Sequence, residues 1–177
     1  MATMILLPNG SDGVSSDWIV VGAGSVKNAL MFDDGTTAYV KCDDIGERMN
    51  IEFANPSVAE GDIDTIDSVR FLSSGKSNHR SSPTRISVAY YDPFGNPSEN
   101  ANYFAHRTNF TTINGTARPY SDGVGGTDWT YANLEDLEMR VTMASIIEVY
   151  FSYLAMEVTY TPAVTVTDNA TFFGANF

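Results

Sequence analysis

Short runs of β-favouring residues, separated by turn-forming residues, are the feature that most limits the folds open to this chain. The runs are rich in Val, Ile, Tyr, Phe and Thr, whereas Gly, Asn, Asp, Ser and Pro gather between them. Asp34-Gly35, Asp92-Pro93-Phe94-Gly95 and Asn114-Gly115 supply residues that tolerate positive φ or fix φ in a tight turn. Because tight turns join neighbouring antiparallel strands, the pattern predicts an all-β chain.

About eight strands are expected from these runs. They lie near Trp18–Val21, Ala29–Phe32, Ala38–Cys42, Met49–Phe53, Ser68–Leu72, Arg85–Tyr91, Tyr103–Thr111 and Ile146–Tyr160. Residues 156–160 alternate between apolar and polar side chains, and residues 86–90 repeat that alternation. A strand with this period buries one face, so we expect a core that includes Ile86, Val88, Val158 and Tyr160.

One segment breaks the period of two. Between Trp129 and Val141, Thr130 is a residue that can cap the start of a helix, and Leu134 and Leu137 lie three residues apart. The segment therefore predicts one short helix of one or two turns, which closes an end of the sandwich.

An excess of acidic residues limits the partners of the chain. Its 22 Asp and Glu residues against 10 Lys and Arg give a net charge of -12, which repels nucleic-acid phosphates and anionic lipid headgroups. No apolar run approaches the roughly 20 residues of a membrane-spanning helix. Residues 1–8 also lack the basic flank and long apolar segment of a secretory signal. We therefore expect a soluble chain with no nucleic acid and no membrane as partners.

Two segments imitate ligand-binding motifs. Residues 19–27 read Ile-Val-Val-Gly-Ala-Gly-Ser-Val-Lys, like a dinucleotide-binding strand and turn, but Lys27 stands where the third glycine belongs. Asp62 and Asp64 would share one face of a strand, which leaves a structural calcium ion open as the alternative to a solvated edge. The spacing matches no EF-hand loop, so we expect no metal site and no cofactor.

Residues for nucleophilic or acid–base catalysis are sparse. The histidines are His79 and His106, and neither lies in a hydrolase motif. Cys42 is the single cysteine, so it has no thiol partner for a disulfide or a zinc site and is expected to be a small buried strand residue. We therefore expect no catalytic residues and no enzyme.

Aromatic side chains offer a possible contact surface for sugars. Trp129 and Tyr131 lie beside a Gly-rich loop that also carries Tyr120. Exposed rings stack on sugars, whereas packing at the core or rim is the more common role of such residues. Trp129 and Tyr131 are therefore the candidate sugar-stacking residues.

Three segments carry a family resemblance. They are Trp18 followed by residues 30–40 (Leu-Met-Phe-Asp-Asp-Gly-Thr-Thr-Ala-Tyr-Val), residues 128–138 (Asp-Trp-Thr-Tyr-Ala-Asn-Leu-Glu-Asp-Leu-Glu), and Val158-Thr159-Tyr160. Together they resemble small jelly-roll virion structural proteins of tailed bacteriophages. The resemblance implies a two-sheet antiparallel sandwich of jelly-roll type over residues 18–162, with residues 1–17 as an N-terminal arm and residues 163–177 as a C-terminal tail.

Two functional hypotheses follow from this resemblance. The first is a non-enzymatic bacteriophage virion structural protein, a capsid decoration (cement) or tail-associated subunit made in the host cytoplasm. Its partners would be copies of itself and other virion proteins, and the candidate assembly contacts are Phe172, Phe173 and Phe177 in the tail. The alternative is a carbohydrate-binding adhesion module of a tail fibre or baseplate, whose partner would be host surface polysaccharide.

Overall fold

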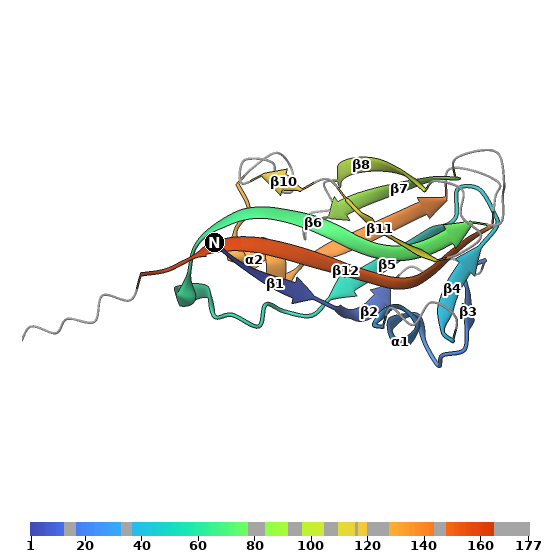
Figure 1. Cartoon of the computed structure of the whole chain (residues 1–177), viewed down its shortest axis with the longest axis horizontal. Helices are drawn as coiled ribbons and strands as arrows, with labels where there is room; N and C mark the ends of the chain where they lie inside the picture. The colour runs from blue at the N-terminus through green and yellow to red at the C-terminus, as the bar shows by residue number, and fades with distance from the viewer. Residues whose placement is uncertain are drawn as a thin grey trace, which may run out of the picture.

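Two antiparallel β-sheets packed face to face make up the structure (Figure 1). It is a computed structural model, and it describes residues 1–12, 17–32, 37–77, 84–91, 97–104, 110–115, 117–119, 128–143 and 148–164. The predicted all-β, two-sheet antiparallel sandwich of jelly-roll type is confirmed. None of the helices in these described ranges is long and apolar enough to cross a membrane.

The larger sheet is built around two long strands. Its strands are β1 (Ala2–Leu6), β3 (Ile19–Val21), β4 (Tyr39–Cys42), β6 (Ile63–Ser77), β9 (Thr111–Asn114), β10 (Arg118–Pro119) and β12 (Val149–Pro162). β6 and β12 run side by side along the length of the molecule (Figure 1). β12 pairs on its other side with β4 near its start and with β1 near its end. Two strands that are far apart in the sequence are therefore held along the same side of one central strand.

The smaller sheet has the strand order β2-β5-β11-β7-β8. Its strands are β2 (Pro8–Asp12), β5 (Arg48–Phe53), β7 (Thr84–Tyr91), β8 (Pro97–Phe104) and β11 (Glu138–Met143). Side chains of β5 and β11 alternate between buried and more exposed positions, so each strand turns one apolar row toward the other sheet. The core lies between these rows.

The core predictions hold where side chains are described. Val158 and Tyr160 in β12 are buried, which confirms the face assigned to them. Ile86 and Val88 lie in β7, opposite Met143 and Val141 in the register of β11; their side chains lie outside the described part of the structure.

The predicted strand Ala29–Phe32 is wrong, because most of this segment belongs to a helix, α1 (Val26–Leu30). The Ser25 hydroxyl caps this helix by accepting a hydrogen bond from the Asn28 amide. Val26, Ala29 and Leu30 are buried at the i, i+3 and i+4 spacing of one helical face. The described part of the chain thus has two short α-helices, α1 and the predicted one after Trp129, where one was predicted.

The predicted helix after Trp129 is present but shorter than its segment. It is α2 (Tyr131–Glu135), and Thr130 caps it in a capping box with Asn133. Leu134 and Leu137 are buried, as expected of an element that closes one end of the sandwich. The chain then enters β11 at Glu138, because from this residue the side chains alternate with period two.

The N-terminal segment is part of the sandwich. Residues 1–17 were expected to form an arm, but they contain β1, which pairs with β12, and β2, which pairs with β5. Met4 and Leu6 of β1 are buried in the core, so main-chain bonds and apolar burial both hold this segment in place. A short 3-10 helix, η1 (Glu60–Asp62), precedes β6. The division at residue 163 stays a prediction, because residues 165–177 lie outside the described ranges.

Candidate functional site

Three aromatic rings meet on the outer side of the larger sheet. Tyr39 comes from β4, Phe110 directly precedes β9, and Tyr150 lies in β12. The ring centroids of Tyr39 and Tyr150 are 5.5 Å apart at an interplanar angle of 62°, and those of Tyr39 and Phe110 are 6.3 Å apart at 48°. All three side chains are half-buried. We call this cluster, together with Lys41, Lys76 and Glu148, the aromatic face.

Strand alternation and register bring these residues together. Val40 and Cys42 of β4 are buried, so Tyr39 and Lys41 project from the opposite side of the strand. Tyr150 lies directly opposite Lys41 of β4 on one side and Lys76 of β6 on the other. Residues directly opposite in a sheet share a face, so three neighbouring strands place a lysine, a tyrosine and a second lysine in one row.

The two lysines of this row are held in different ways. Lys41 Nζ donates to Glu148 Oε1 at 2.8 Å, and the Tyr150 hydroxyl donates to the other oxygen of the same carboxylate. The hydrogen bond to Glu148, followed by the charge of that carboxylate, raises the pKa of the Lys41 ammonium above its ordinary value. Lys76 Nζ instead lies 4.8 Å from the centroid of the Phe110 ring and 4.6 Å from that of Tyr150.

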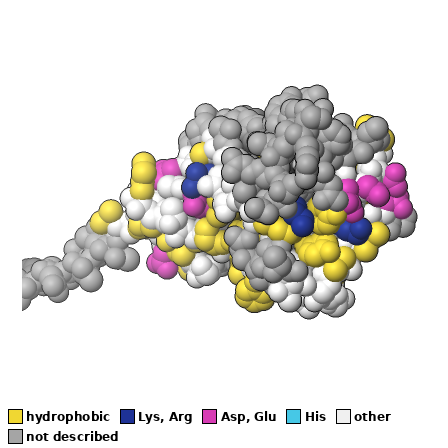
Figure 2. All heavy atoms as spheres, turned by 45° about the vertical axis from the view of Figure 1, so that its right-hand side comes forward, with side chains coloured by type: hydrophobic (Ala, Val, Ile, Leu, Met, Phe, Trp, Pro, Cys, Tyr) yellow, Lys and Arg dark blue, Asp and Glu magenta, His cyan; other side chains and the backbone are white. Residues whose placement is uncertain are grey.

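The aromatic face lies at the end of the molecule where β6 ends and β12 begins. This end carries β3 and β4 and is opposite the end that carries α2 (Figure 1). When that side is turned forward, hydrophobic side chains gather in a patch bordered by basic and acidic side chains (Figure 2). The arrangement combines apolar ring surface with hydrogen-bonding groups at its border, as in sites that bind amphipathic small molecules.

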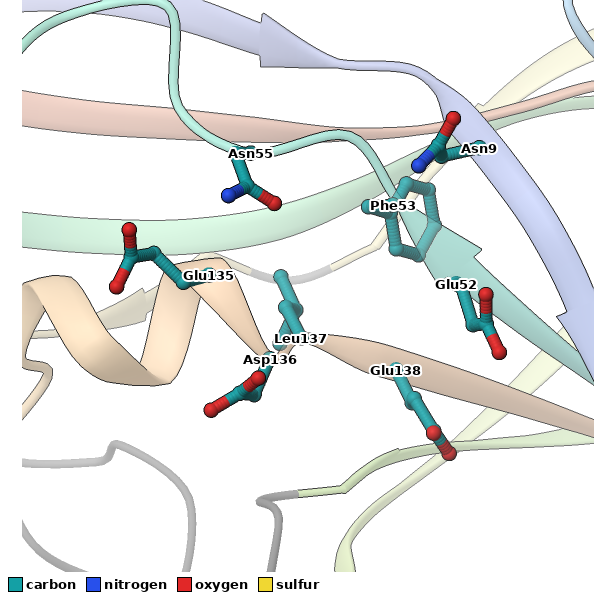
Figure 3. A pocket seen from close by; sticks show the side chains of 8 residues that line it. All are labelled: Asn9, Glu52, Phe53, Asn55, Glu135, Asp136, Leu137 and Glu138. Atoms are coloured by element: carbon teal, nitrogen blue, oxygen red, sulfur yellow. The ribbon is translucent and has the colours of Figure 1, made fainter.

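A pocket lies where β5 ends and β11 begins. This acidic pocket has a volume of about 460 Å³ and is lined by Asn9, Glu52, Phe53, Asn55, Glu135, Asp136, Leu137 and Glu138. Its carboxylates fan out in different directions: Glu52 and Glu138 extend to one side of the sheet, whereas Glu135 projects elsewhere (Figure 3). Phe53 is buried, so the acidic pocket offers oxygen atoms without an aromatic surface.

The acidic side chains that the structure describes do not form a metal site. Within the described ranges, no three His, Cys, Asp or Glu side chains are grouped so that they could hold a metal ion. Asp64 is exposed, and Asp67 accepts hydrogen bonds from the Thr65 and Thr161 hydroxyls. The acids of the β6 segment therefore have solvent or threonine hydroxyls as neighbours.

The motif that imitates a dinucleotide turn has a structural role. Gly22 has φ of +75°, and a Cβ atom there would lie 1.8 Å from the carbonyl oxygen of Thr37. The glycine is thus required by a close approach of two backbone segments. The helix that follows, α1, has five residues, and no longer helix within the described ranges could offer its N-terminus to a pyrophosphate.

The sequence-predicted sugar-stacking residues lie at the other end of the molecule. Trp129 is 3% exposed and belongs to the core, so its ring presents no open face to a ligand. Tyr131 is half-buried, and its hydroxyl donates to the carbonyl oxygen of Val58 at 3.0 Å. Both residues line a small hollow of about 170 Å³ together with Glu60 and Asp64. The structure does not bring them next to the aromatic face.

Several other predicted residues lie outside the described part of the chain. These are the tail phenylalanines Phe172, Phe173 and Phe177, the histidines His79 and His106, and Tyr120. Cys42 is buried in β4, as expected of a structural thiol, and burial raises its pKa.

Sequence reasoning missed the aromatic face, although a signal for it exists. Tyr39 and Lys41 flank Val40 with period two inside a correctly predicted strand. Alternation thus puts Tyr39 on the outer side of the sheet. The pairing of β4 with β12, which brings Tyr150 beside it, joins residues that are far apart in the chain and has no local signature.

Comparison with known proteins finds structures with a similar fold but does not assign the chain to a family. No protein-family model matches the chain, and no curated protein matches it. A solved protein from Bacteroides thetaiotaomicron, whose proposed role is sugar binding, superposes with a TM-score of 0.50 at 10% identity, covering 87% of this chain and 86% of that one. At this identity the likeness shows a shared fold.

Two further solved structures have lower TM-scores. The CBM22-1 xylan-binding domain of Paenibacillus barcinonensis Xyn10C gives 0.44 at 9% identity, covering 88% of this chain and 97% of that one. The enzymatically active domain of tailspike protein 4 from bacteriophage CBA120 gives 0.44 at 12% identity, covering 81% of this chain and 20% of that one.

Proposed function

We propose that this chain is a non-enzymatic carbohydrate-binding module whose ligand lies on the aromatic face. The observation that carries the proposal is the cluster of three half-buried rings, Tyr39, Phe110 and Tyr150, on the outer side of the larger sheet. The fold shared with a protein of proposed sugar-binding role supports it.

The chemistry of a pyranose matches this surface. A sugar ring has an apolar C–H face and a rim of hydroxyl groups, so it needs an aromatic surface with donors and acceptors at its border. Lys41 supplies N–H donors, and Glu148 supplies acceptor oxygens beside Tyr150. The hydrogen bonds among these three groups fix them before any ligand arrives, which reduces the entropy lost on binding.

The acidic pocket is the weaker candidate for a sugar site. It supplies acceptor oxygens but lacks an accessible ring, and Glu52 lies directly opposite Glu138 in the sheet. Like charges in this position destabilise the strand pair. A neutral sugar would bring little compensation for that repulsion.

Binding to a panel of soluble polysaccharides, measured by affinity gel electrophoresis and calorimetry, tests the proposal. Tyr39→Ala and Tyr150→Ala should each weaken binding about tenfold, since a stacked ring contributes on the order of 1 kcal/mol or more. Ile5→Ala is the matched control, because Ile5 is 43% exposed on β1 of the same sheet. A panel in which nothing binds, or tyrosine variants that bind like the parent protein, would contradict the proposal.

The place where such a module acts is a separate proposal. We propose an adhesion role in a tailed-phage virion, with host surface polysaccharide as the partner; this rests on the sequence resemblance.

Assembly into the virion as a decoration or tail-associated subunit stays a prediction that depends on Phe172, Phe173 and Phe177. Truncation after residue 164 tests it, because the shortened chain should fold normally but fail to enter particles; normal incorporation would remove the support for assembly through the tail.

A further inference from the structure

Lys76 is held between two aromatic rings. Its ammonium lies 4.8 Å from the Phe110 ring centroid and 4.6 Å from that of Tyr150. The backbone supports this position, because Lys76 of β6 is directly opposite Tyr150 of β12. A lysine side chain normally samples many rotamers. Here the rings on both sides limit where the charge can lie.

Among the residues that the structure describes, the carboxylates near the aromatic face pair with cations other than Lys76. Lys41 is paired with Glu148 at 2.8 Å, and elsewhere in the sheet Arg70 is paired with Glu157 at 2.7 Å. Among the described residues, no carboxylate lies within ion-pair distance of Lys76, and its ammonium contacts the two rings. This is notable in a chain whose acids outnumber its bases 22 to 10.

With respect to the described part of the chain, the ammonium of Lys76 therefore keeps hydrogen-bonding capacity for a ligand. A ring face attracts the positive charge but offers no lone pair in the way that a carboxylate does. Three N–H donors at a fixed position suit a group with several acceptor oxygens. The Tyr39 ring extends the aromatic surface beside Phe110 and Tyr150, and among the described residues no lysine ammonium lies over it. A sugar ring next to Tyr39 would bring its substituents close to Lys76.

We propose that the aromatic face selects acidic sugars, and that the Lys76 ammonium binds the anionic group of the sugar. This inference rests on the proposed carbohydrate-binding function. The group is a carboxylate, as in a uronic acid; a sulfate ester offers the same chemistry of a negative charge on several oxygens. The net charge of -12 repels an acidic polysaccharide at long range, so its recognition depends on close pairing with a cation such as Lys76.

The test compares each acidic polymer with its neutral counterpart. Polygalacturonate is measured against the same polymer with its carboxyl groups reduced, and dextran sulfate against dextran. The parent protein should prefer polygalacturonate over the reduced polymer about tenfold, as expected for a hydrogen bond between charged groups. The Lys76→Met variant should lose that preference but still bind the neutral polymer. The Lys76→Arg variant should keep the preference for polygalacturonate. Lys27→Met is the control, because Lys27 lies in α1 and donates to Asn9 of β2, a strand of the smaller sheet.

The outcomes separate this inference from the proposed function. Preference for dextran sulfate alone would support the anion site and assign it to sulfate. Binding of neutral polymers without preference, or a Lys76→Met variant that keeps the preference, would overturn the inference and leave sugar binding intact. Equal loss of acidic and neutral binding in Lys76→Met would show that Lys76 only positions the rings. If no polymer binds, both proposals fail.

Discussion

At the scale of single residues, three glycines differ in why their positions require glycine. The two possible reasons are a positive φ and a close approach of another backbone segment. Gly22 combines a φ of +75° with a close approach to the Thr37 carbonyl, whereas Gly46 has a φ of +87° and open space around it. Gly24 has neither feature. An L side chain at positive φ is strained, and a Cβ atom against a carbonyl oxygen forces the backbone to move.

Replacing each of the three glycines by alanine should show the relative cost of the positive φ and of the contact with Thr37. Gly22→Ala should cost the most stability, on the order of 2 kcal/mol or more, Gly46→Ala about 1 kcal/mol, and Gly24→Ala close to zero. Urea unfolding followed by circular dichroism measures the three values. Equal costs at Gly22 and Gly24 would mean that the contact between Gly22 and Thr37 does not constrain the fold.

The raised pKa values of Cys42 and Lys41 predict how the free energy of unfolding changes with pH in the alkaline range. Burial raises the pKa of the Cys42 thiol, and the Glu148 hydrogen bond raises that of the Lys41 ammonium. A pKa raised in the folded state means that the folded protein holds the proton more tightly than the unfolded chain does. The stabilisation is complete below the ordinary pKa and is lost as pH rises through the folded value.

Stability should therefore fall as pH rises above about 8.5, the ordinary thiol pKa. Urea midpoints between about pH 7 and pH 11.5 measure this dependence, because the Lys41 contribution is lost only above about 10.4, the ordinary lysine pKa. Cys42→Ala should flatten the first part of the curve, since it removes the thiol. A parent protein whose stability rises over this range would contradict the assigned directions.

At the scale of elements, the pattern of β12 shows what strand periodicity can and cannot predict. Alternation in residues 156–160 gave the buried face correctly, because one side of the strand packs against the other sheet. The Ala29–Phe32 prediction failed because the cap at Ser25 and the helical spacing of Val26, Ala29 and Leu30 outweighed the local apolar run. β1 was missed because its pairing with β12 joins opposite ends of the chain.

A pair of neighbouring substitutions tests the assigned face of β12. Val158 is fully buried, whereas Thr159 is half-buried on the other face. Val158→Ala should destabilise the fold by about 2–4 kcal/mol through the cavity that it leaves. Thr159→Ala should stay within about 0.5 kcal/mol of the parent protein. Chemical unfolding of the two variants measures both, and a larger loss at Thr159 would reverse the assignment.

At the scale of the whole molecule, the two ends of the sandwich differ in chemistry. One end carries α2 and the buried Trp129, and the other carries the aromatic face and its two lysines. Sequence proximity favoured the first end as the sugar site, because Trp129 and Tyr131 are neighbours in the chain. Tyr39, Phe110 and Tyr150 come together only through the pairing of distant strands, which sequence alone does not specify.

The most direct test of the central claim is to locate a bound sugar on the protein. Backbone amide shifts of the full chain, followed by NMR during titration with the polysaccharide fragment that binds best, report the site residue by residue. Sugar binding at the aromatic face predicts that the largest changes fall on residues 39–41, 76, 110–112 and 148–150. Changes centred on residues 129–131 or on the acidic pocket, with the aromatic face unaffected, would contradict it.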